Sequence, residues 1–117
     1  MDISIVIATH DRPESLARLL TSLAPQIVPG KHEILIADNG TPKPSPLPPV
    51  VTVSAHIHDP APGKCRVQNR AIALAQGMII VCLDDDLMVA GEYLDAVERF
   101  FREHPEFAAM KGKVLPA

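Results

Sequence analysis

Aromatic side chains are scarce in this chain, whose 117 residues include three Phe, one Tyr and no Trp. Proteins that bind single-stranded nucleic acid stack bases on aromatic rings, so the sequence provides little material for such a surface. Basic residues are also in the minority, since 11 Lys and Arg stand against 14 Asp and Glu, for a net charge of −3. Without a basic excess, we expect no nucleic-acid partner.

Cysteines and long hydrophobic runs are also lacking. Cys65 and Cys82 are too few for a disulfide scaffold, and Cys82 lies in an apolar run, where we expect it to be buried. That run, residues 78–83, is far too short to span a bilayer, and no signal-like segment opens the chain. These features predict a soluble, cytoplasmic protein.

The sequence does contain enough hydrophobic material for a folded core, because 47% of its residues are hydrophobic and 21% are charged. Its length fits a single domain over residues 1–117. Short β-branched runs alternate with helical patterns, such as the stripe formed by Leu16, Leu19, Leu20 and Leu23. This alternation predicts an α/β fold in which helices flank a mostly parallel sheet as three layers.

The bounds of the expected elements follow from these patterns and from the Pro and Gly residues that interrupt them. We expect strands at residues 3–8, 34–37, 50–55 and 78–83, with a final one within 107–115. We expect helices that begin at Pro13 and that cover residues 64–76 and 91–103.

Acidic side chains follow three of the expected strands. Asp11 comes after the first, Asp38 after the second, and the cluster of Asp84, Asp85 and Asp86 after the fourth. Parallel strands end at the same edge of a sheet, and ligands of such folds bind there. The sequence therefore predicts a ligand site at that edge.

The three adjacent carboxylates of this cluster repel one another, so a cation, a proton or water must offset their charge. Mg²⁺ and Mn²⁺ prefer oxygen ligands and often connect carboxylates to phosphate oxygens. Asp84 and Asp86 are two residues apart and can point the same way in an extended segment, with Asp85 pointing elsewhere. The alternative is a solvated acidic turn before the next helix.

Other polar residues also have two interpretations. Asp38 either forms a turn with Asn39 and Gly40 or accepts a hydrogen bond from an N–H of a nucleobase. His56 and His58 share one face of an extended segment and could contribute to a zinc site, but no further His or Cys has suitable spacing. The glycine-rich phosphate loops and nucleophile elbows of dehydrogenases, P-loop NTPases and serine hydrolases are absent from the sequence.

Four segments, in this order, resemble the nucleotide-binding half of a family 2 glycosyltransferase. They are residues 5–16, 34–40, 63–77 and 83–86, and together they extend over most of the chain. The resemblance implies a Rossmann-like GT-A fold, a nucleoside-diphosphate sugar as donor, and transfer of that sugar to an acceptor.

The resemblance also implies roles for individual side chains. Thr9 and Arg12 would lie at the nucleotide pocket, Asp38 would contact the base, and Asn69 would border the pocket. In the D-x-D pair of the family, Asp84 would touch the ribose of the nucleotide.

The metal site of the family would be formed by Asp84 and Asp86, which would hold an Mn²⁺ or Mg²⁺ ion on the diphosphate. Members of the family carry the acceptor site and a catalytic carboxylate in a second half, for which this chain has no room after Asp86. We therefore expect a truncated donor-binding half that transfers no sugar alone and that self-associates or needs a partner chain. The alternatives are a non-catalytic nucleotide-binding or assembly module and, with less support, a D-x-D phosphatase.

Overall fold

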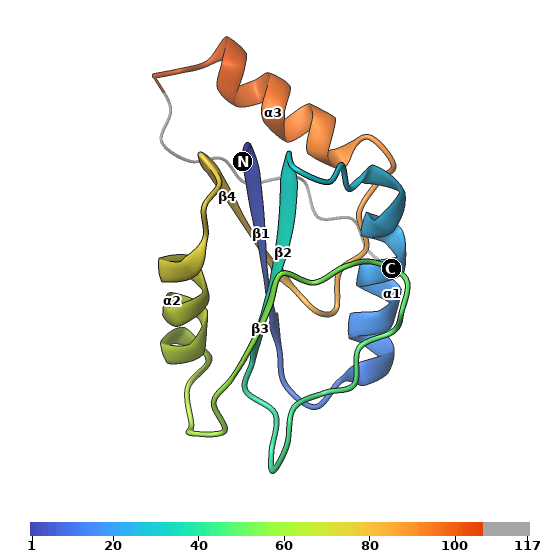
Figure 1. Ribbon diagram of the computed structural model, residues 1–117, viewed down its shortest axis with the longest axis vertical. Helices are drawn as coiled ribbons and strands as arrows, with labels where there is room; N and C mark the ends of the chain where they lie inside the picture. The colour runs from blue at the N-terminus through green and yellow to red at the C-terminus, as the bar shows by residue number, and fades with distance from the viewer. Residues whose placement is uncertain (107–117) are drawn as a thin grey trace.

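The structure, a computed structural model, describes residues 1–106. Four parallel strands form one sheet, with helices on both of its faces (Figure 1). The strands are β1 (Ile3–Thr9), β2 (His32–Asp38), β3 (Ala55–His58) and β4 (Ile79–Asp84). The helices are α1 (Pro13–Leu23), α2 (Lys64–Leu74) and α3 (Tyr93–Glu103), and a short 3₁₀ helix, η1 (Ala24–Gln26), follows α1. The predicted α/β fold with a parallel sheet is confirmed.

The sheet has the strand order β3-β2-β1-β4, so the first strand of the chain lies in its interior. Every residue of β1 and β2 is buried, because each strand has a neighbour on both sides and helices above and below. The register pairs Thr9 with Asp38 and Ala8 with Asp84. The strands therefore end together at one edge of the sheet, which we call the carboxyl edge.

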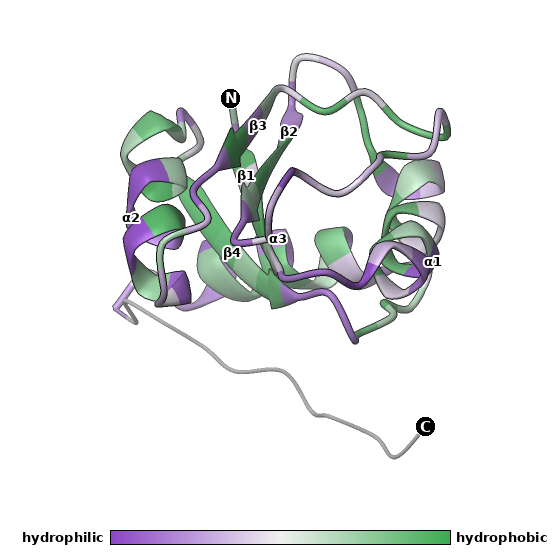
Figure 2. Ribbon diagram, turned by 90° about the horizontal axis from the view of Figure 1, so that it is seen from below, coloured by the Kyte–Doolittle hydropathy of each residue, from purple (hydrophilic) through white to green (hydrophobic). Residues whose placement is uncertain are grey.

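Side chains along β1 alternate between two hydrophobic cores. Ile3, Ile5 and Ile7 pack with the leucines of α1 and with α3, whereas Val6 packs with Val67 of α2 on the other face. Figure 2 looks onto the carboxyl edge and shows the apolar strands between α1 and α2. Helix α3 crosses the opposite ends of the strands (Figure 1), so within residues 1–106 loops surround the carboxyl edge.

The strand expected at residues 50–55 is wrong, because the third strand begins only at Ala55. The chain turns at Pro49, which follows another proline, and it first pairs with β2 at Ala55. Val51 and Val53 instead pack, partly buried, against the core on the α1 face. This apolar run therefore covers the core as a loop and adds no length to the sheet.

The burial expected for Cys82 is also wrong, since its side chain is exposed. Within residues 1–106, β4 lies at the edge of the sheet, and α2 lies over β1, β2 and β3 but leaves this face of β4 open. Val81 and Leu83 point into the core, whereas Ile80 and Cys82 point away from it, and Met78 just before the strand is 90% exposed. In the described part of the chain, the apolar run thus forms a strand with one exposed face.

The remaining expectations concern the ends of helices and the end of the chain. The expected helices are confirmed, but two of them are shorter than expected. α2 ends at Leu74, and α3 begins at Tyr93. The final strand within residues 107–115 lies outside the described residues and stays a prediction. Within residues 1–106, the helices are too short or too polar to cross a membrane.

Candidate functional site

The carboxyl edge brings the ends of three strands together, as the sequence predicted. Asp38 is the partner of Thr9 across β1 and β2, and Asp84 is the partner of Ala8 across β1 and β4. Because neighbouring strands lie about 4.8 Å apart, the backbones of Asp38 and Asp84 are separated by roughly 10 Å. The end of β1 therefore lies between the two acids.

The acidic cluster divides between the interior and the solvent. Asp84 and Asp86 are exposed, whereas the carboxylate of Asp85 is buried and accepts two hydrogen bonds from the β1–α1 segment. Thr9 Oγ1 donates to Asp85 Oδ2 at 2.9 Å, and Arg12 Nη1 donates to Asp85 Oδ1 at 3.3 Å. Strand alternation explains this division, since Asp85 continues the inward side of β4 and Asp84 the outward side.

The exposed acids have few partners. Lys64, the first residue of α2, places Nζ 3.2 Å from Asp84 Oδ1, and both side chains are more than half exposed. Such a surface pair contributes little to stability and can rearrange around a ligand. Within residues 1–106, no three His, Cys, Asp or Glu side chains are grouped as a metal site. Asp84 and Asp86 nonetheless offer accessible oxygen ligands of the kind that Mg²⁺ and Mn²⁺ take, with water and phosphate completing the coordination shell.

Asp38 is fully buried and holds the loop that follows β2. Its Oδ1 accepts from the backbone N–H of Gly40 at 2.8 Å, and its Oδ2 accepts from the N–H of Ser45 at 2.7 Å. His56 Nε2 also lies 2.7 Å from Oδ2. Burial by itself would raise the pKa of Asp38, but these hydrogen bonds and the charge of His56 lower it below its ordinary value.

This lowered pKa predicts a specific acid sensitivity. Because the pKa of Asp38 is lower in the folded chain than in the unfolded one, its contribution to stability is complete above about pH 4 and is lost as the pH falls further. In Asp38→Asn, this part of the acid-induced loss should disappear. Urea unfolding of both proteins between pH 7 and pH 3 measures it, and equal pH dependence would contradict the assignment.

Two polar residues connect the loops at this edge: Asp11, which the sequence predicted here, and Asn39, which it indicated only as part of a turn. Asn39 donates from Nδ2 to the carbonyls of Asp59 and Ala61, both at 2.7 Å. Asp11, with a left-handed φ of 53°, accepts from the N–H of Thr41 at 3.0 Å and from its hydroxyl at 3.2 Å. The β1–α1, β2–β3 and β3–α2 loops are thus connected by short polar side chains at strand ends.

Other candidates lie apart from this cluster. Asn69 is exposed on the face of α2 opposite Val67 and Ala71, the buried residues of that helix, so it points away from the sheet. His58 Nε2 is 2.7 Å from the carbonyl oxygen of Gly40. His56, on the same face of β3, contacts Asp38. Both histidines therefore support the β2–β3 loop in this structure.

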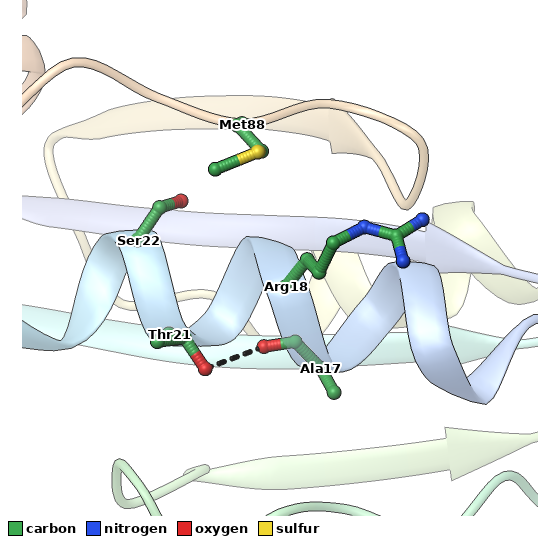
Figure 3. A pocket seen from close by; sticks show the side chains of 5 residues that line it. All are labelled: Ala17, Arg18, Thr21, Ser22 and Met88. Carbon is green, nitrogen blue, oxygen red and sulfur yellow. Dashed lines mark hydrogen bonds between the residues drawn. The ribbon is translucent and has the colours of Figure 1, made fainter.

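The described part of the chain has cavities that lie apart from the predicted site. One of about 290 Å³ lies along the outer side of α1, lined by Ala17, Arg18, Thr21, Ser22 and Met88 (Figure 3). In it Thr21 Oγ1 donates to the carbonyl of Ala17 at 2.7 Å, so its one threonine hydroxyl bonds within the helix. Arg18 is the one charged residue in this lining, which contains no Asp or Glu. The carboxyl edge remains the place where charged groups converge.

The sequence matches the family described as glycosyl transferase family 2 over residues 4–112. The chain belongs to this family. The four segments that carry the resemblance all lie within the matched residues. No curated protein sequence matches this family 2 chain.

Solved structures with the same fold are longer. The crystal structure of S. aureus TarS 1-349 has a TM-score of 0.69 and 21% identity, covering 100% of this family 2 chain and 39% of that one. A second structure, of S. aureus TarS, has a TM-score of 0.71 and 19% identity, with coverages of 99% and 23%. A third structure, of S. aureus TarS 1-349 in complex with UDP-GlcNAc, has a TM-score of 0.70 and 20% identity, and the match covers 100% of this chain and 37% of that one. At these identities the likeness shows a shared fold, and this chain spans under two fifths of the length of each.

Proposed function

We propose that the chain is the donor-binding domain of a glycosyltransferase and that it binds a nucleoside-diphosphate sugar at the carboxyl edge. The observation that carries this proposal is the contact of Arg12 with Asp85, which places this cation beside the exposed Asp84 and Asp86 at the end of β1 in a chain of family 2. The similar fold of TarS in complexes with UDP-GlcNAc and with UDP supports this class of ligand. The base and the sugar stay open within it.

The nucleoside would lie against the β2–β3 loop. Asp38 holds this loop through Gly40, Ser45 and His56, so it shapes the surface that a base would meet. A direct contact between Asp38 and the base requires one of these hydrogen bonds to be exchanged for one from the ligand. Asn69 points away from the sheet, so it would border the pocket only if α2 changed which of its faces is exposed.

The diphosphate would lie between Arg12 and the exposed acids. Asp84 would touch the ribose, and Asp84 with Asp86 would hold Mn²⁺ or Mg²⁺, which neutralises the charge of a diphosphate leaving group when it is bound. Lys64 is already beside Asp84 and would move from the carboxylate to a phosphate oxygen. The acceptor site and the general base would come from a further segment or a partner chain, which agrees with the partial coverage of TarS.

Nucleotide binding should depend on the metal, because the carboxylates of Asp84 and Asp86 repel a diphosphate unless a cation lies between them. We expect UDP or GDP to bind more tightly with Mn²⁺ or Mg²⁺ than with EDTA, and Asp86→Asn to weaken the metal-dependent binding roughly tenfold. Titration calorimetry of the 117-residue chain measures both effects. The control is Asp95→Asn, an exposed acid on α3 at the far end of the sheet.

The possible outcomes separate the alternatives. Equal affinity with and without metal would overturn the roles of Asp84 and Asp86. Absence of binding to any nucleoside diphosphate would favour an assembly module over a donor-binding domain. Transfer of sugar by the chain alone would overturn the proposal that the acceptor site lies elsewhere.

A further inference from the structure

Asp85 is the member of the acidic cluster that the proposed metal site leaves unused, and it is also the buried one. Its side chain is only 5% exposed, and its backbone N–H donates to the carbonyl of Ala8 at 3.1 Å. A buried carboxylate needs charged or hydrogen-bonding partners, because removing it from water is costly. Asp85 has them in Thr9 and Arg12, and each takes one of its two oxygens.

The guanidinium group of Arg12 contacts Asp85 through one nitrogen, while much of the side chain is exposed to solvent. Its side chain is 59% exposed, and Nη1 contacts Asp85. A guanidinium group carries five N–H donors in a fixed planar arrangement, so the contact with Asp85 leaves donors directed toward solvent. Arg12 is also the N-cap residue of α1, but its side chain makes no hydrogen bond to that helix. The orientation of this side chain therefore depends on Asp85.

We infer that Asp85 is a positioning residue, which holds the guanidinium of Arg12 at the carboxyl edge so that its remaining donors bind the diphosphate of the donor. This inference rests on the proposed function. Asp85 would itself contact neither metal nor nucleotide, because its side chain is only 5% exposed and its oxygens face Thr9 and Arg12. The pairing also explains the central acid of the cluster, because a neutral residue there would leave Arg12 without its anchor.

A double-mutant cycle on UDP affinity tests this inference. Arg12→Ala should weaken UDP binding about tenfold, as expected for a lost charge-assisted hydrogen bond. Asp85→Asn should weaken it by a similar factor in the unaltered chain, but by less than twofold when Arg12 is already alanine. Arg12→Lys should not restore the affinity, because an ammonium group cannot bind Asp85 and a phosphate in the planar arrangement of a guanidinium.

A second readout separates positioning from general support of the fold. Binding of uridine, which has no diphosphate, should change less than twofold in Asp85→Asn, while UDP binding falls. Asp85→Asn retains the size of the side chain and one acceptor oxygen, and thermal unfolding followed by circular dichroism checks that it folds. If it does not fold, Asp85→Glu, which keeps the charge but displaces the carboxylate by one methylene group, supplies the same comparison of UDP with uridine.

The results distinguish this inference from the function on which it rests. UDP binding with additive effects of the two substitutions, or with equal losses for uridine and UDP, would overturn the inference alone. A failure of the unaltered chain to bind any nucleoside diphosphate, with or without Mn²⁺, would overturn the proposed function and the inference together, and binding of GDP alone would move the same cycle to GDP.

Discussion

Replacing Asp38 with alanine is expected to lower the free energy of unfolding by about 3 kcal/mol. The carboxylate is buried and accepts hydrogen bonds from the N–H groups of Gly40 and Ser45, with His56 beside it. Removing it leaves these groups without their partner, and each unsatisfied buried group costs about 1–3 kcal/mol. The β2–β3 loop should loosen at the same time, so nucleotide binding should weaken as well.

Urea unfolding at pH 7 measures this loss, with two variants for comparison. Asp38→Asn retains one acceptor oxygen and should lose less than Asp38→Ala. Asp86→Ala removes an exposed acid and should change the free energy of unfolding by less than 0.5 kcal/mol or so, as is usual for surface substitutions. A loss below about 1 kcal/mol in Asp38→Ala would show that the loop is held by other contacts.

Replacing Gly77 with alanine is expected to cost about 3 kcal/mol, at the upper end of the range for overpacking. A Cβ atom on Gly77 would lie 2.5 Å from the backbone nitrogen of Ser4 and 2.8 Å from the carbonyl carbon of Ile3. Both atoms belong to β1, which cannot move aside because β2 and β4 pair with it on either side. The N–H of Gly77 also donates to Ser4 Oγ at 2.7 Å, and a shift would break this bond.

The matched control is Gly91→Ala. A Cβ at Gly91 would meet nothing within 4 Å, so this substitution should be close to neutral. Thermal unfolding of the two variants beside the unaltered chain gives the comparison. Equal midpoints for Gly77→Ala and Gly91→Ala would mean that the chain before β4 can move away from β1, against the packing described above.

Much of the fold was predictable because its central strands have an unambiguous pattern. Residues 3–8 are apolar or small on both faces, as expected of a strand between two layers of helices. The start of β3 was not predictable, because Val51 and Val53 satisfy the same pattern while packing as a loop. The exposure of Cys82 depends on which strands α2 covers, and the apolar run of β4 carries no signal of that position.

The candidate site was predictable in its location and less so in its contacts. The rule that parallel strands end together placed Asp38 and Asp84 at one edge, and strand alternation separated Asp85 from its neighbours. The inward direction of Asp38 was hidden, because its partners Ser45 and His56 are 7 and 18 residues away along the chain. Such contacts depend on how a loop folds back, which local patterns do not describe.

The interior position of β1 has a consequence for the order in which the chain assembles. Thr9 and Asp85 are 76 residues apart, yet they hydrogen bond across the edge of the sheet. Contacts between such distant residues must overcome the entropy of closing a long loop, and they form late and slowly compared with local ones. β1 is synthesised before the other three strands, but one of its sides has no partner until β4 pairs with it. We therefore expect the anchor of Arg12 to be among the last parts of the domain to form, after the contacts of β1 with α1 and β2.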